Sequence, residues 1–167
     1  KTLFALTAGQ IWGESRNVLY LNMEDYSGWK DFSEEDTSQN LSALFYHLRQ
    51  GKIFPPLTGL VHSWGNLDYI PHVSSFEDLR NISYREWTDL FTHLEKESSY
   101  QLLVLDIGNG IDQLFSILDL CTQIYMPVLD DWVSKEKLEQ FKKIAFSLSD
   151  TLGSKIQELH LPFTPCA

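Results

Sequence analysis

The sequence has few cysteines and no long apolar run, and each absence excludes a class of protein. The two cysteines, Cys121 and Cys166, form no CxxC pair and have no histidine at metal-ligand spacing. Isolated thiols of this kind suit a reducing cytoplasm rather than a secreted fold held by disulfides. No stretch approaches the roughly 20 apolar residues that a membrane-spanning helix requires. We therefore expect a cytoplasmic chain without a transmembrane segment.

Basic residues are also scarce. Lys and Arg number 13 against 23 Asp and Glu, which gives a formal net charge of −10. Broad binding to nucleic acid depends on clustered Lys and Arg, so this balance argues against a nucleic-acid partner. A nucleotide stays compatible with it, because a few donors in one place suffice. The 167 residues are 43% hydrophobic, which is ordinary globular composition and enough to bury a core.

Short apolar strands alternate with helices of about a dozen residues, which is the pattern of βαβ units around a parallel sheet. We expect strands at 17–21, 67–72, 101–105, 123–128 and 155–160. We expect helices at 2–15, 37–50, 111–119 and 134–149, and one more behind a capping box of Ser83 and Glu86. Residues 22–36 and 51–66 are expected to be irregular. The pattern predicts one α/β domain over 1–167, a three-layer α/β/α sandwich with a mostly parallel sheet.

Helical spacing also predicts which side chains face the core. The inward residues of the first and last long helices are expected to be Phe4, Ala8, Ile11 and Trp12, and Leu138, Phe141, Ile144 and Leu148. In the helix after Ser83, the same spacing selects Trp87, Leu90, Phe91 and Leu94.

Polar residues follow two of the expected strands. Asn22 and Glu24 come after strand 17–21, and Asp106 and Gly108 come after strand 101–105. In an open parallel sheet, ligands bind beyond the carboxyl ends of the strands, where these residues lie. An Asp at a strand tip can hold Mg²⁺ or its waters, and a following glycine lets the backbone approach a terminal phosphate. An Asp that simply ends a strand before a turn explains this motif alone equally well.

The amino terminus adds a second nucleotide signal. Lys1-Thr2 opens an amphipathic helix, as the last two residues of a phosphate-binding loop of the form GxxxxGK[ST] do. The first residue is Lys rather than Met. We therefore expect an excised piece, whose first strand and most of whose phosphate loop precede residue 1.

Four segments follow one another along nearly the whole chain: Lys-Thr-Leu at 1–3, Val-Leu-Tyr-Leu-Asn-Met-Glu at 18–24, Leu-Val-Leu-Asp-Ile-Gly-Asn-Gly at 103–110 and Ile-Tyr-Met-Pro-Val at 124–128. In this order and spacing they resemble the ParA/MinD family of deviant phosphate-loop ATPases, including its CpaE-like branch. The resemblance implies a P-loop NTPase-like (Rossmann-like) fold that binds ATP with Mg²⁺.

The resemblance also assigns roles to the matching residues. It implies that Lys1 contacts the β- and γ-phosphates, that Thr2 ligates Mg²⁺, and that Asp106 supports Mg²⁺ through water. Pro162 and Phe163, beyond the last strand, correspond to residues that enclose the adenine.

The strand after the first helix departs from the family pattern. Asn22 and Glu24 stand where the family has two aspartates. By resemblance, Asn22 still contacts the nucleotide, Glu24 positions the attacking water, and Gly108 lets the backbone approach the γ-phosphate. Asn22 carries no charge for a metal shell, and Glu24 is one methylene longer than Asp. Hydrolysis is therefore expected to be either slow or lost with binding retained.

As a whole, the resemblance implies an ATP-dependent homodimer that switches with hydrolysis and holds an unidentified protein partner. Such switches serve partition, division-site placement or the assembly of a cellular machine, in the cytoplasm or at the periphery of a membrane or polar assembly. One alternative is a scaffold derived from such an ATPase, which Asn22 favours. Another is a dinucleotide-binding α/β domain, against which the lack of a G-x-G-x-x-G after a strand counts.

Overall fold

The computed structural model describes residues 1–27, 39–50 and 57–161. The chain divides into two compact units, Lys1–Asp112 and Gln113–Ala167. The first unit holds a four-stranded sheet and the second a two-stranded sheet. Among the described residues, no helix combines the length and the apolarity needed to cross a membrane.

The sheet of the first unit has the strand order β2-β3-β1-β4. The strands are β1 (Val18–Met23), β2 (His62–Trp64), β3 (Leu67–Ile70) and β4 (Leu102–Ile107). Strand β1 pairs in parallel with β3 and β4, and β2 pairs antiparallel with β3. All six residues of β1 are buried, as expected for a parallel strand that is covered on both faces.

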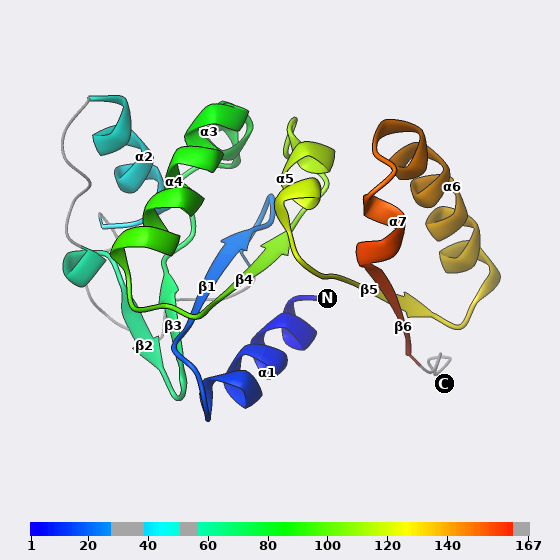
Figure 1. The fold of residues 1–167 in the computed structure, drawn as a ribbon, viewed down its shortest axis with the longest axis horizontal. Coiled ribbons are helices and arrows are strands. Elements are labelled where there is room, and N and C mark those ends of the chain that lie inside the picture. The colour runs from blue at the N-terminus through cyan, green and yellow to red at the C-terminus, as the bar shows by residue number, and fades with distance from the viewer. Residues whose placement is uncertain (28–38, 51–56, 162–167) are drawn as a thin grey trace. The chain divides into compact units, whose positions relative to one another are not determined.

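Helices cover both faces of this sheet. They are α1 (Thr2–Gly13), α2 (Leu41–Arg49), α3 (Phe76–Arg80) and α4 (Tyr84–Glu97), with a short 3₁₀ turn, η1, at Leu57–Gly59. Figure 1 shows α1 on one side of the sheet and α2, α3 and α4 on the other. The prediction of a three-layer α/β/α arrangement with a mostly parallel sheet is confirmed.

Capping side chains set where the helices begin. The predicted capping box is present: Ser83 Oγ accepts from the Glu86 amide, and Glu86 Oε2 accepts from the Ser83 amide at 2.8 Å. The expected helix over 37–50 begins later than predicted, at Leu41. The reason is that Asn40 is an N-cap, with its Oδ1 accepting from the Ala43 amide at 3.0 Å. Residues 37 and 38 lie outside the described residues.

The prediction that residues 51–66 are irregular is wrong for its last part, where β2 forms a hairpin with β3. Gly65 makes the tight turn possible, because its φ of 61° lies in the left-handed region that favours glycine. Gln10 of α1 supports the turn by accepting from the Asn66 amide at 2.9 Å. The hairpin thus adds an antiparallel strand at the edge of the parallel sheet.

The face that α1 turns to the sheet agrees with the prediction only in part: Trp12 packs against the core cluster, as expected. Ala5, Leu6 and Gly9 are buried, whereas Ile11 is 60% exposed. A Cβ on Gly9 would lie 2.9 Å from Leu67 Cδ1, so the helix lies close on the sheet. The prediction from periodicity was based on large apolar residues. Small residues occupy the side of the helix that lies closest to the sheet.

Replacement of Gly13 by alanine is expected to destabilise the first unit. A Cβ at Gly13 would lie 1.9 Å from the backbone oxygen of Asn66. Displacing a backbone atom costs more free energy than displacing the end of a flexible side chain. We expect Gly13→Ala to lower the free energy of unfolding by about 1–3 kcal/mol, the usual cost of overpacking. Gly59→Ala is the matched control, because nothing lies within 4 Å of its added Cβ. Urea unfolding measures both, and equal midpoints would contradict the contact.

The second unit pairs β5 (Ile124–Leu129) in parallel with β6 (Ile156–Leu161). Its helices are α5 (Leu114–Leu120), α6 (Trp132–Leu148) and α7 (Leu152–Lys155). Helix α6 begins earlier than predicted, because Asp131 is its N-cap and accepts from the Ser134 amide at 2.9 Å. Leu138 and Ala145, seven residues apart, are its buried positions, whereas Ile144 and Leu148 are more than half exposed. The prediction of those two as core residues is wrong.

Candidate functional site

The candidate site lies at the carboxyl ends of β1 and β4, where the register pairs Asn22 with Asp106. Helix α1 begins at this edge. The ammonium of Lys1 donates to the carbonyl oxygen of Ile107 at 2.6 Å, lies 3.8 Å from Asp106 Oδ1, and forms an ion pair with Glu24. Three charged residues from distant parts of the sequence therefore meet in one place. Thr2, the first residue of α1, follows Lys1 directly and is half-buried.

Asp106 is the one buried carboxylate among the described residues, with 2% of its surface exposed. Its Oδ2 accepts a hydrogen bond of 3.1 Å from the hydroxyl of Tyr20 on the neighbouring strand. Its Oδ1 is buried and has no hydrogen-bond partner among the described residues. A buried carboxylate oxygen normally has a partner, so this one has the capacity for a cation or for a metal-bound water.

The phenol of Tyr20 is held in its neutral form. Burial, the negative charge of Asp106 and the hydrogen bond to it all raise the pKa of Tyr20 above its usual value. A group with a raised pKa keeps its proton at neutral pH. Tyr20 is therefore a stable donor to Asp106.

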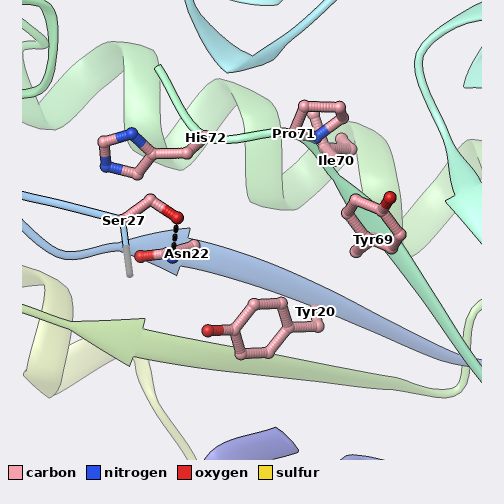
Figure 2. A pocket seen from close by; sticks show the side chains of 7 residues that line it. All are labelled: Tyr20, Asn22, Ser27, Tyr69, Ile70, Pro71 and His72. Atoms are coloured by element: carbon pink, nitrogen blue, oxygen red, sulfur yellow. Dashed lines mark hydrogen bonds between the residues drawn. The ribbon is translucent and has the colours of Figure 1, made fainter. Parts of the chain in front are cut away.

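Asn22 is also buried, and its side chain holds the loop that follows β1. Its Oδ1 accepts from the Glu24 amide at 3.1 Å, and its Nδ2 donates to Ser27 Oγ at 3.2 Å, the bond drawn in Figure 2. This local bonding pattern is typical of an Asx turn. The amide at this position thus orders the loop that carries Glu24.

His72, just beyond β3, contacts the same loop. Its Nε2 lies 2.7 Å from the carbonyl oxygen of Glu24, and its Nδ1 lies 2.9 Å from that of Val73. Figure 2 shows His72 above Ser27 and Asn22. All three residues line a small pocket, and Tyr20 lines it as well. Neither Tyr20 nor His72 was singled out from the sequence. Tyr20 had a signal, namely a hydroxyl in an otherwise apolar strand two residues before Asn22.

The loops after β1 and β4 lie against each other. The Gly108 amide donates to the Met23 carbonyl at 2.9 Å, and a Cβ on Gly108 would lie 3.1 Å from the Cα of Glu24. A Cβ on Gly110 would overlap the carboxyl group of Asp25. Glycine is needed here because of close approach. A displacement of either loop would therefore displace the other.

The residues at this edge fit part of a magnesium-nucleotide site. The ammonium of Lys1 and the amino-terminal end of the 12-residue helix α1 can bind phosphate oxygens. Asp106 Oδ1, which has no hydrogen-bond partner among the described residues, can accept from a metal-bound water. Pro162 and Phe163, the predicted adenine contacts, lie outside the described residues, so their role stays a prediction.

Comparison of the whole chain with protein-family models and with curated proteins finds no match. Comparison with solved structures finds similar folds. A ParA family ATPase from Chlorobium tepidum TLS is 20% identical, with a TM-score of 0.70 over 93% of this chain and 67% of that one. A plasmid partition protein from Borrelia burgdorferi is 14% identical, with a TM-score of 0.71 over 99% of this chain and 74% of that one.

A third similar structure is the MinC:MinD cell division protein complex of Aquifex aeolicus, at 13% identity and a TM-score of 0.62 over 95% of this chain and 62% of that one. The strand order, the two helical layers and these likenesses define a P-loop NTPase-like α/β fold. Within that class, the chain has the fold of the ParA and MinD ATPases.

Proposed function

We propose that this chain is the body of a Mg²⁺-dependent ATP-binding switch of the ParA/MinD type, which hydrolyses ATP. The observation that carries the proposal is the meeting of Lys1 and Asp106 at the carboxyl edge of the sheet, with Asp106 Oδ1 buried and without a hydrogen-bond partner among the described residues. Both residues were assigned to the site from the sequence, and 3.8 Å separates their charged atoms. The ion pair with Lys1 at 3.8 Å leaves this oxygen able to accept a hydrogen bond from a metal-bound water.

Each residue then has a role. Lys1 binds the β- and γ-phosphates, and Thr2 binds the metal. Asp106 accepts a hydrogen bond from a metal-bound water. Mg²⁺, when bound, neutralises phosphate charge. The ammonium of Lys1 contacts the carboxylate of Glu24 in this structure, so a triphosphate competes with Glu24 for it. A Glu24 released in this way is free to orient the attacking water.

We also propose a cellular role, by analogy with the proteins of similar fold. ATP binding brings two copies together, and hydrolysis releases them and an unidentified protein partner. This cycle serves spatial organisation or the assembly of a cellular machine, in the cytoplasm or at the periphery of a membrane or polar assembly. The CpaE-like branch is the version that we propose, because the net charge of −10 does not favour coating of DNA.

The rest of the phosphate loop completes the proposed single domain. Among the described strands, β4 is the last of its sheet, so one of its edges is open. We propose that the strand preceding residue 1 pairs with this edge and leads into the phosphate loop. A Gly-rich stretch in the ten residues before Lys1 would support this arrangement, and a Gly-poor stretch would contradict it.

Asn22 favours a second candidate, an ATPase-like scaffold that binds nucleotide with little hydrolysis. Both of its polar atoms bond to the loop after β1, and it supplies no charge. The two candidates differ in turnover alone.

The intact protein is expected to bind ATP with Mg²⁺ and to hydrolyse it. Glu24→Ala should retain binding and lower turnover by about 100-fold, the scale of losing a group that orients or deprotonates the nucleophile. Glu95→Ala, exposed on α4, is the matched control. Phosphate release and a fluorescent ATP analogue measure the two steps. Tight binding without turnover in the unsubstituted protein would favour the scaffold, and no binding would contradict both candidates.

A further inference from the structure

Tyr20 is immobilised within the core between α1 and the sheet. Its side chain is fully buried, in a cluster that includes Leu6 of α1, Tyr69 of β3 and Val104 of β4. A phenol in such a place costs free energy unless its hydroxyl has a partner. The ring is held by packing, so the hydroxyl has a fixed position. Figure 2 shows this hydroxyl directed toward the carboxyl ends of the strands.

The partner of this hydroxyl is Asp106, across the β1–β4 pair. Tyr20 OH donates to Oδ2 at 3.1 Å, whereas Oδ1 is 3.8 Å from the Lys1 ammonium and has no hydrogen-bond partner among the described residues. A carboxylate can rotate about its last torsion unless one oxygen is bound. The phenol occupies one oxygen, so the other is presented to the edge where Lys1 lies.

We propose that Tyr20 is a positioning residue, which fixes the carboxylate of Asp106 so that Oδ1 stays available to a Mg²⁺-bound water. This inference rests on the proposed function of the site. A hydroxyl is not needed to fill the core, because phenylalanine has the same ring. The hydroxyl is needed to orient the one buried carboxylate among the described residues. Partners that orient a metal-supporting carboxylate commonly change metal affinity by about 10- to 100-fold.

Tyr100 provides a matched control of the same chemistry away from the site. Its hydroxyl donates to Asp68 Oδ2 at 2.9 Å, from the segment between α4 and β4 to a carboxylate on β3. Tyr20→Phe and Tyr100→Phe each remove one phenol–carboxylate bond. A purely structural role for both predicts no difference in Mg²⁺ dependence between the two variants.

The test measures binding of a fluorescent ATP analogue by the intact protein as a function of Mg²⁺ concentration. Tyr20→Phe is expected to raise the half-saturating Mg²⁺ concentration about 10-fold, with nucleotide binding in EDTA unchanged, and Tyr100→Phe is expected to leave both unchanged. In an Asp106→Asn background, Tyr20→Phe should add less than about twofold, because it acts through that carboxylate.

The outcomes separate this inference from the proposed function. A normal Mg²⁺ dependence in Tyr20→Phe, with Mg²⁺-dependent binding in the unsubstituted protein, overturns the positioning role and leaves the proposed function standing. An additive effect in the Asp106→Asn background also overturns it. Lack of Mg²⁺-dependent ATP binding in the unsubstituted protein overturns both.

Discussion

Replacement of Asp106 by asparagine is expected to lower Mg²⁺-dependent ATP turnover by about 100-fold, the upper range for losing a residue that supports a metal through its ligands. The substitution keeps the shape of the side chain and removes its charge. The bond from Tyr20 can persist, because the amide of asparagine retains one oxygen acceptor. The place of Oδ1, which has no hydrogen-bond partner among the described residues, is taken either by an uncharged amide oxygen or by an amide nitrogen, which is a donor. Phosphate release at saturating ATP is the measurement.

The stability of Asp106→Asn is not expected to fall with its activity. Asp106 is 2% exposed, and burial of a neutral amide costs less than burial of a carboxylate. Asp106→Asn is therefore expected to unfold at the same urea concentration as the unsubstituted protein, or at a higher one. Asp112→Asn is the control, because Asp112 lies in the segment after the same strand with a 61% exposed side chain. Equal losses of turnover in Asp106→Asn and Asp112→Asn would contradict a role for Asp106 in the site.

The strands that carry the site could be predicted from the sequence. An apolar stretch that ends in a carboxylate is a local pattern, and it predicts Glu24 and Asp106 at the carboxyl ends of β1 and β4, where the structure has Asp106 as the last residue but one of β4. Topology predicted that these two residues meet, because parallel strands present their carboxyl ends to one edge. The place of Lys1 beside them was implied by the phosphate-loop resemblance. The structure adds the ion pair of Lys1 with Glu24, and 3.8 Å between Lys1 and Asp106.

Tyr20 and His72 could not be assigned in the same way, because their partners are distant in sequence. Tyr20 and Asp106 are 86 residues apart, and His72 and Glu24 are 48 apart. A tyrosine in an apolar strand has the same propensity whether its hydroxyl meets water or a carboxylate. The inward face of α1 was misjudged for a related reason. Close packing on the sheet requires small residues such as Gly9, and the spacing of large apolar residues does not predict their positions.

The departure at Asn22 has a structural explanation that the sequence did not provide. In the sequence, Asn22 is an uncharged residue at a position where the family has an aspartate. In the structure, its amide bonds both to the Glu24 backbone and to Ser27, and His72 contacts the Glu24 carbonyl. The residue at this position orders the loop that presents Glu24. The question of hydrolysis therefore moves from Asn22 to Glu24 and its release from Lys1.

Replacement of Trp87 by alanine is expected to have the largest effect on stability. Trp87 lies on α4 with none of its surface exposed, and its ring meets Phe45 of α2 edge-on at 4.8 Å and stacks on Phe91 at 5.7 Å. Removal of a buried tryptophan costs about 3–5 kcal/mol, because the cavity is only partly refilled. Urea unfolding followed by circular dichroism measures the loss. Trp132→Ala, at a position that is 80% exposed, is the control and should change stability by less than about 0.5 kcal/mol.

A second substitution at the same position separates packing from polarity. The Nε1 of Trp87 is buried without a hydrogen-bond partner among the described residues, and an unpaired buried donor costs about 1–3 kcal/mol. Trp87→Phe removes that donor and keeps most of the ring contact with Phe45. We therefore expect Trp87→Phe to lose less than half as much stability as Trp87→Ala. A loss as large as that of alanine would mean that the full indole shape, rather than buried aromatic area, joins α4 to α2 behind the sheet.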